Sequence, residues 1–387
     1  MRTGVFLFGG VEMPDAGSGP PHPKDRRASS QEVWETQERL LDLAVCAERL
    51  GYDIFWLTEH HFQHEGYEVL PNALLFAAFV AERTSRIKIG TMFNIIPQWH
   101  PLRFAEDFAM LLNLSQGRAI MGVGRGTVPR ETEPLSGGRV SVGSFDNPRS
   151  AEADTVNREV MVEAMEVIRL AYEQENFAFH GKHFDLPPAG IPDRDGRVTQ
   201  LTLLPRPRYP FEVWQAITSP PTLEAVPRAG YGGVFWNQHY ELIRRSWQRY
   251  EEIWAETHDS ELKPGEKRML VLNVCIEDSH EAAYKSAKPG HDEFWKFLGP
   301  YAWSRGYLDR ATGKPVGPGL IPSLDESLEQ KTFLVGTPEQ VAEGVQFYKD
   351  MLHLNELCVF PNFPGDRYDK TVEQMARFQQ QVLPLVK

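Results

Sequence analysis

The stretch Asp53-Ile54-Phe55-Trp56-Leu57-Thr58-Glu59-His60-His61-Phe62 contains an apolar run that ends in three ionisable side chains. The apolar run is typical of a buried β-strand. In parallel α/β proteins, binding and catalytic groups lie at the carboxyl ends of the strands. A histidine at such a position can exchange a proton near neutral pH. The stretch therefore predicts a parallel α/β fold whose chemistry is placed at the end of this strand.

Strand-like and helix-like segments alternate on both sides of this stretch. The other predicted strands are residues 4–8, 87–96, 119–123, 211–216, 232–236, 269–276 and 357–360. Helical patterns lie between them at 31–50, 72–82, 101–117, 157–173, 220–230 and 241–257, and further helices begin at 337 and at about 370. Eight alternating pairs predict an α/β protein built as one (β/α)₈ TIM barrel, with a doubly wound sheet as the competing layout.

Local signals fix several helix ends. Ser29 and Glu32 predict a capping box at the start of the first helix, and Gly51 predicts its end. The segment Thr337-Pro338-Glu339-Gln340 predicts a second capping box, with proline in the first turn. These signals support the alternation read from the apolar pattern.

Three irregular segments interrupt the alternation, at about 127–156, 181–210 and 278–332. We interpret them as insertions in a single domain that covers residues 1–387. The first and third follow predicted strands four and seven, and in a barrel this position places them over the active face. We therefore expect them to act as lids.

Composition excludes several classes of protein. Of 387 residues 41% are hydrophobic, and the formal charge of −12 comes from 41 basic and 53 acidic residues without a long basic run. Nucleic acid and anionic membranes are therefore not expected partners. The longest apolar run, residues 74–81, is too short to span a bilayer, and the start reads as a strand rather than a signal peptide. Three scattered cysteines indicate a reducing compartment, so we expect a cytoplasmic protein.

The residue pattern alone leaves three roles open for His60. It could be a general base or hydrogen-bond donor, a metal ligand together with neighbours such as His61 or His64, or a structural histidine. Adjacent side chains on an extended strand point to opposite faces, so His60 and His61 are not expected to act together. No known zinc-binding spacing is present, and we predict no metal site.

Several motifs in one order resemble the bacterial luciferase-like, flavin-dependent monooxygenases. They are the 53–62 stretch, Ile89-Gly90-Thr91, Pro97 with His100-Pro101, Ala105-Glu106-Asp107, 114–118 (Leu-Ser-Gln-Gly-Arg), 122–126 (Gly-Val-Gly-Arg-Gly) and 336–341 (Gly-Thr-Pro-Glu-Gln-Val). The resemblance implies a barrel that binds reduced FMN. It also implies that reduced flavin and O₂ form a C4a-(hydro)peroxyflavin, which oxygenates a substrate. Thr218 and Gly124 depart from luciferase itself, so light emission is not expected.

The resemblance also assigns residues. It makes His60 the catalytic histidine and places Arg125, Ser219 and Thr222 at the flavin phosphate. A helix N-terminus with hydroxyl groups and an arginine suits a phosphate on physical grounds as well. The full set of expected cofactor-binding residues is Glu59, Met92, Asn94, Arg125, Thr218, Ser219, Thr222 and Trp236. The family often carries a non-proline cis peptide at the position that corresponds to Met92–Phe93.

Aromatic residues near the predicted strand ends indicate an apolar or aromatic substrate pocket, to which we assign Phe62, Phe93 and Trp99. Trp295, Tyr301 and Trp303 in the third insertion are candidates for closing it. No dinucleotide-binding glycine motif follows a strand, so reducing power is expected from a separate NAD(P)H:flavin reductase. The family further implies a homodimer. The alternatives are a deazaflavin-dependent hydride-transfer enzyme on the same barrel, a metal-dependent barrel hydrolase and a non-catalytic flavin-binding relative.

Overall fold

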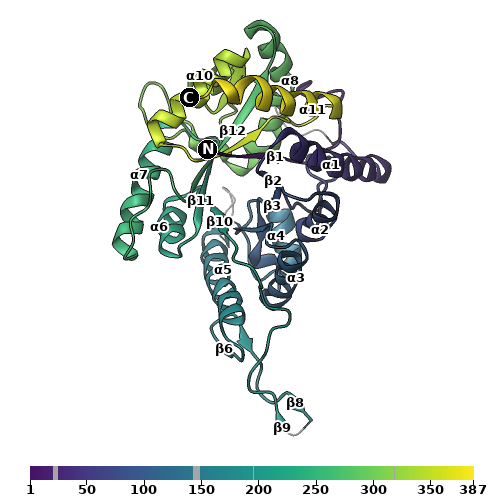
Figure 1. Ribbon diagram of the computed structural model, residues 1–387, viewed down its shortest axis with the longest axis vertical. Coiled ribbons are helices and arrows are strands. Elements are labelled where there is room, and N and C mark those ends of the chain that lie inside the picture. Colours follow the sequence, from purple (N-terminus) through teal and green to yellow (C-terminus); the bar gives the residue numbers. More distant parts are fainter. Residues whose placement is uncertain (21–24, 143–148, 195, 318) are drawn as a thin grey trace.

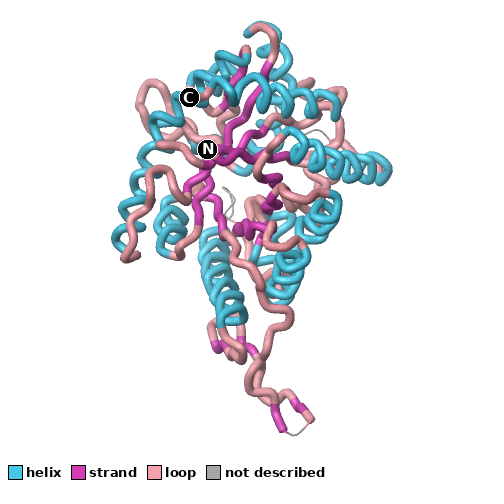
Figure 2. The backbone as a smooth tube through the Cα atoms, in the orientation of Figure 1, coloured by secondary structure: helices cyan, strands magenta, loops and turns pink. Residues whose placement is uncertain are grey.

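Eight parallel strands close into a barrel at the centre of the molecule (Figure 1, Figure 2). The computed structural model describes residues 1–20, 25–142, 149–194, 196–317 and 319–387. The barrel strands are β1 (Arg2–Leu7), β2 (Ile54–Leu57), β3 (Lys88–Thr91), β5 (Ala119–Gly124), β10 (Val213–Ala216), β11 (Gly232–Trp236), β12 (Arg268–Ile276) and β14 (Glu356–Phe360). They pair in the order β10-β11-β12-β14-β1-β2-β3-β5, and β10 pairs with β5. That last pairing closes the sheet, which confirms the (β/α)₈ barrel and rejects a doubly wound sheet.

Helices surround the strands, and most of their ends lie close to the predicted ones, but α5 (Arg149–Glu173) begins eight residues before the predicted start at 157. The others are α1 (Ser30–Leu50), α2 (Ala73–Arg83), α3 (Pro101–Leu114), α6 (Pro220–Arg228), α7 (Tyr240–Thr257), α10 (Pro338–Leu352) and α11 (Tyr368–Arg377). Both capping boxes are confirmed, at Ser29 with Glu32 and at Thr337 with Gln340. Gly51 ends α1 with a φ of 90°, a backbone conformation that glycine adopts without steric cost.

Trp56 fills the barrel interior and is fully buried. Its neighbour across the β2–β3 pairing is Gly90. A Cβ atom at Gly90 would lie 2.2 Å from the indole ring, so only glycine leaves room for this side chain. The apolar run that predicted the second strand therefore supplies a large, fully buried side chain to the barrel core.

The predicted third strand is wrong in one respect, because it is not continuous. Residues 87–96 contain β3, a short strand β4 (Asn94–Ile95) and the start of the 3₁₀ helix η1 (Ile96–Gln98). The peptide bond between Met92 and Phe93, which lies between the two strands, is cis, as the resemblance implied. β4 still pairs with β5, so the segment stays at the barrel wall.

The segments interpreted as insertions contain more regular structure than the sequence suggested. Residues 127–156 include α4 (Pro129–Leu135) and the first turns of α5, while 143–148 lie outside the described residues. Residues 179–197 carry two hairpins, β6–β7 (Phe179–His180 with Asp185–Leu186) and β8–β9 (Pro192–Asp193 with Gly196–Arg197). Figure 1 shows β8 and β9 at the end of an arm far from the barrel.

The third segment is largely helical. It contains α8 (His280–Leu298), η2 (Gly299–Tyr301), η3 (Trp303–Gly306) and α9 (Leu324–Glu329), and β13 (Phe333–Gly336), which pairs with β12, follows it. Pro289 and Gly290 disfavoured a helix in the sequence. The structure keeps α8 continuous because tertiary packing outweighs that preference. A Cβ atom at Gly290 would lie 2.5 Å from Phe363 Cβ, which shows how closely the helix approaches the barrel side.

Charged side chains meet at the amino ends of the strands. Arg2 donates to Glu212 over 2.8 and 2.6 Å and to Glu356 over 2.7 Å. Lys88 donates to Glu212 over 2.7 Å. Groups at this end of a barrel serve stability, whereas the opposite end holds the active site.

Candidate active site

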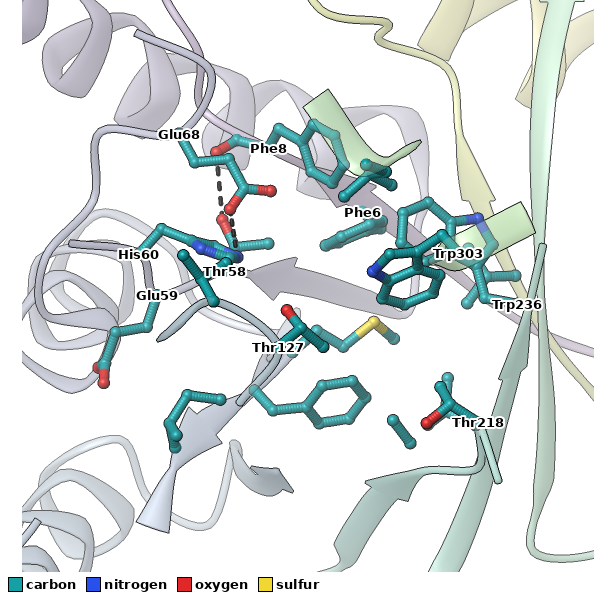
Figure 3. Close-up of a pocket in the computed structure, with 18 of the residues that line it drawn as sticks. Phe6, Phe8, Thr58, Glu59, His60, Glu68, Thr127, Thr218, Trp236 and Trp303 are labelled. Atoms are coloured by element: carbon teal, nitrogen blue, oxygen red, sulfur yellow. Dashed lines mark hydrogen bonds and ion pairs between the residues drawn. The ribbon is translucent and has the colours of Figure 1, made fainter. Parts of the chain in front are cut away.

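A pocket opens at the carboxyl ends of the barrel strands (Figure 3), and the space between its walls, with its open mouth included, is about 730 Å³. The apolar residues that line it are Phe6, Phe8, Met92, Phe93, Ile95, Val128, Ala216, Val234, Trp236, Val271, Phe297, Leu298 and Trp303. The polar ones are Thr58, Glu59, His60, Glu68, Thr127 and Thr218. Apolar walls with a few polar groups suit a largely apolar molecule whose orientation those groups fix.

The His60 ring lies between two carboxylates. Its Nδ1 is 3.0 Å from Oε1 of Glu131, and its Nε2 forms an ion pair with Glu68. Both glutamates are only 2% exposed. Gln63 Nε2 donates to the same oxygen of Glu131 over 2.6 Å. The catalytic histidine implied by the family therefore lies in the pocket wall, with both of its ring nitrogens engaged.

The pKa of the Glu131 carboxyl lies below its ordinary value despite burial. Burial alone would raise the pKa of its carboxyl, but the charge and hydrogen bond of His60, together with the bond from Gln63, lower that pKa. Glu131 belongs to α4, and the neighbouring Arg130 donates to Glu65 over 2.9 Å and to Gln63 over 2.9 Å. These contacts fasten the first insertion to the segment that follows β2.

Glu59 holds the strand ends together. Its carboxylate accepts hydrogen bonds from the Ala73 backbone, from Asn94 Nδ2 and from Trp99 Nε1, each over 3.1 Å. Figure 3 shows this carboxylate turned away from the side of the cavity that holds Trp236 and Trp303. The observed contacts of Glu59 and Asn94 are structural, and their expected contact with a cofactor stays a prediction.

Two of the expected substrate-pocket residues lie elsewhere. Phe62 is 54% exposed and does not line the pocket, because its left-handed backbone, with a φ of 57°, turns the chain after His60. Trp99 also lies outside the lining. Its indole is held by Glu59 and packs edge-on against Phe104, with ring centroids 5.8 Å apart. Of the three residues assigned to a substrate pocket, Phe93 lines this cavity and Phe62 and Trp99 do not, so a substrate contact for those two stays a prediction.

The residues expected at a flavin phosphate are already engaged with one another or with neighbours. Arg125 Nη1 donates to Asp154 Oδ1 over 2.8 Å. The hydroxyl oxygens of Ser219 and Thr222 lie 3.0 Å apart at the start of α6. Thr218, just before them, lines the pocket. The roles of Arg125, Ser219 and Thr222 stay predictions.

Of the other expected site residues, Met92 and Trp236 line the pocket. Sequence reasoning missed Glu68, Glu131 and Phe297. Glu131 contacts His60 across 71 residues of sequence, and no spacing rule links a helix to a strand end at that distance. Phe297 belongs to α8, which was not expected to be a helix. Trp303, a lid candidate, lines the pocket and packs against Trp236 with ring centroids 5.1 Å apart.

Three further observations bear on the class of site. Within the described ranges, no group of three or more His, Cys, Asp or Glu residues could hold a metal ion. Cys46, Cys275 and Cys358 are buried and free. Within the same ranges, none of the helices combines the length and apolar character needed to cross a bilayer.

The fold and the pocket define a (β/α)₈ protein with an apolar, histidine-containing ligand site at the carboxyl end of its strands. The profile of the luciferase-like monooxygenases matches residues 1–353. The chain therefore belongs to the luciferase-like monooxygenase family.

Two different cofactors appear among the relatives and solved structures to which the chain is similar. The chain is 26% identical over 349 residues to an F420-dependent glucose-6-phosphate dehydrogenase of Amycolatopsis mediterranei, covering 89% of this chain and 93% of the relative. It is 27% identical over 318 residues to 4-hydroxyprotoasukamycin monooxygenase of Streptomyces nodosus subsp. asukaensis, covering 80% and 76%. The solved oxygenating constituent of 3,6-diketocamphane monooxygenase from Pseudomonas putida, a complex with FMN, superimposes with a TM-score of 0.75. It is 20% identical to this chain, and the match covers 100% of this chain and 99% of the other. At 20% identity, this structural similarity shows a shared fold.

Proposed function

We propose that the protein is the oxygenase component of a two-component monooxygenase that uses reduced FMN and O₂. The observation that carries this proposal is the position of His60 in the wall of an apolar pocket at the carboxyl end of a luciferase-like barrel. The substrate proposed is a small apolar or aromatic organic molecule, which suits the walls. Hydroxylation and Baeyer–Villiger insertion have the same balance of oxygen atoms and electrons. One oxygen atom enters the substrate, and the other leaves as water with two electrons from reduced flavin.

The described residues fit a flavin. A flat ring system matches a cavity whose walls include the cis Met92–Phe93 segment, Thr218 and Trp236. We propose that these residues hold the ring and that Ser219 and Thr222, with Arg125, hold the phosphate at the start of α6. Reduced flavin, when bound, supplies the electrons that activate O₂. The chain's own part is to exclude water with Phe297, Leu298 and Trp303 and to place the ionisable side chains beside the reactants.

A separate NAD(P)H:flavin reductase is the proposed source of reduced FMN. A homodimer and a cytoplasmic location complete the proposal. The homodimer rests on the family resemblance, and the cytoplasmic location rests on the three free cysteines.

The test combines anaerobic titration with label incorporation. Chemically reduced FMN is added without O₂, binding is followed by fluorescence, and then ¹⁸O₂ is admitted with a panel of aromatic compounds and cyclic ketones. One ¹⁸O atom in a product, found by mass spectrometry, is the expected result. Binding of reduced FMN followed only by peroxide release, across a broad panel, would contradict the proposal.

The second candidate is hydride transfer with a deazaflavin, which the similarity to the glucose-6-phosphate dehydrogenase of Amycolatopsis mediterranei favours. Oxygen dependence separates the two functions. Substrate oxidation with F420 under strict anaerobiosis would establish this candidate and exclude the oxygenase. A metal-dependent hydrolase finds no support among the described side chains.

A further inference from the structure

Both nitrogens of the His60 ring face buried carboxylates that come from different parts of the chain. Glu68 belongs to the segment after β2, and Glu131 belongs to α4. The two acidic side chains are 2% and 3% exposed, so neither is surrounded by water. We call Glu68, His60 and Glu131 the Glu-His-Glu trio.

The trio must hold two protons between its members. An ionised carboxylate only accepts hydrogen bonds, and a neutral imidazole has one N–H donor. With a single proton, one ring nitrogen would therefore face a carboxylate oxygen with no hydrogen between them, which is costly in a buried site. Two arrangements avoid this. Either His60 is an imidazolium between two carboxylates, or His60 is neutral and one glutamate is protonated.

Glu68 is the member that can pass a proton to a bound molecule. Both ring nitrogens of His60 are engaged, so that ring reaches the pocket without a free nitrogen. Glu68 lines the pocket, whereas Glu131 does not belong to its lining among the described residues. In Figure 3 one oxygen of the Glu68 carboxylate lies against the His60 ring, and the other is directed toward the side that holds Phe6 and Phe8.

We infer that Glu68 is a further catalytic residue, which relays protons between His60 and the reactants, and that Glu131 is a positioning residue for His60. The inference rests on the proposed function, because it assigns Glu68 a step of that reaction. As an imidazolium, His60 passes its Nε2 proton to Glu68, and the O–H bond formed there breaks as the proton goes on to the oxygen atom that leaves as water. His60 is then neutral, and its Nδ1 proton stays in the bond to Glu131. No electrons pass through the trio, and solvent returns the lost proton after product release.

The first experiment counts the protons in flavin-free protein and does not depend on oxygenation. Nitrogen NMR of ¹⁵N-histidine-labelled protein at pH 7, assigned with His60→Gln, reports how many His60 nitrogens carry a proton. Infrared spectroscopy of wild type minus Glu68→Gln reports whether Glu68 is protonated. Two protons in total are expected. One ring proton with both glutamates ionised overturns the inference. In Glu131→Gln, the Nδ1 signal is expected to change, and an unchanged signal overturns the positioning role.

The second experiment measures product per reduced FMN oxidised in Glu68→Gln. Flavin binding is expected to stay near wild type, and product is expected to fall at least about tenfold with a matching rise in H₂O₂. Glu133→Gln is the matched control, because Glu133 is an exposed carboxylate on the same helix as Glu131 and bonds to Ser141. Product within twofold of wild type in Glu68→Gln overturns the inference. If the wild type itself makes no product, the proposed function fails, and the step assigned to Glu68 fails with it, whereas the proton count still decides the charge state of the trio. If Glu68→Gln does not fold, Glu68→Asp replaces it in the infrared difference and in the product assay, with the same outcomes deciding the inference.

Discussion

Arg125 and Asp154 form an ion pair across two elements of the active face, with Arg125 Nη1 donating to Asp154 Oδ1 over 2.8 Å. Arg125 directly follows β5, and Asp154 lies in the early part of α5. The arginine side chain is 17% exposed, so the pair is largely shielded from water. Arg125 is the cation expected to bind a flavin phosphate. A phosphate that binds there must share this guanidinium with Asp154 or displace it.

We predict opposite effects for the two partners on the affinity for reduced FMN. Arg125→Ala removes a charge-assisted contact of about 1.5–3 kcal/mol and should weaken binding about tenfold or more. Asp154→Asn removes a competing carboxylate and should strengthen binding about two- to tenfold. Anaerobic fluorescence titration measures both, with Glu166→Gln on the same helix as the control. If Asp154→Asn binds no better while Arg125→Ala binds as wild type does, Arg125 is not a phosphate ligand.

We predict that His60→Ala keeps flavin binding and loses product. The ring contacts Glu68 and Glu131, and its removal leaves two buried carboxylates without their shared donor. Product per reduced FMN should fall about a hundredfold or more, the range of general acid–base catalysis, while H₂O₂ forms faster. Coupled peroxide and product assays measure the two outcomes. The control is His64→Asn, which replaces a more exposed histidine of the same segment. This variant should retain product. Equal product yields in His60→Ala and wild type would refute a catalytic role.

The barrel could be predicted because its signals are local. Strand and helix periods alternate along the chain, and caps such as Ser29 with Glu32 mark helix ends within four residues. The prediction failed where tertiary packing overrides a local preference. α8 continues through Pro289 and Gly290 because it packs closely against Phe363. The break between β3 and β4 could be anticipated only from the family, since nothing in the apolar pattern of 87–96 indicates it.

The candidate site shows the same division. His60 was expected from its place at a strand end, but its partners were not. Phe62 lies only two residues after His60, yet its own left-handed backbone conformation directs its side chain to solvent. Glu131 reaches His60 only because α4 folds back over the strand end. Contacts between segments far apart in the sequence depend on the three-dimensional path of the chain. The periodicity that reveals strands and helices in a single sequence carries no information about that path.

We predict that Glu59→Gln lowers stability. Its carboxylate accepts three hydrogen bonds in a fully buried position, and the amide would present an NH₂ group to at least one N–H donor. The free energy of unfolding should fall by about 2–3 kcal/mol. Urea unfolding followed by circular dichroism measures the change, with Glu35→Gln on the surface of α1 as the control. If Glu59→Gln is as stable as wild type, the three hydrogen bonds to this side chain do not need a charged acceptor.

We predict that Glu212 governs part of the acid unfolding. Arg2 and Lys88 lower the pKa of its carboxyl from 4.5 to about 2, although burial opposes them. A carboxyl whose pKa is lower in the folded state contributes stability above the unfolded pKa and loses it as pH falls through the folded value. The contribution is therefore present above pH 4.5 and lost between about 4.5 and 2, and it amounts to at most about 3 kcal/mol because the side chain is 31% exposed.

Glu212→Gln should flatten the dependence of melting temperature on pH in that window. Glu356, which bonds to the same arginine, provides the contrast, because burial raises the pKa of its carboxyl despite Arg2. A raised pKa contributes stability at low pH that is lost as pH rises through the folded value, so Glu356→Gln should leave the loss below pH 4.5 in place. Differential scanning calorimetry from pH 2 to 7 compares the two variants with wild type. Identical acid profiles for Glu212→Gln and wild type would show that the Arg2 and Lys88 contacts do not hold this carboxylate ionised.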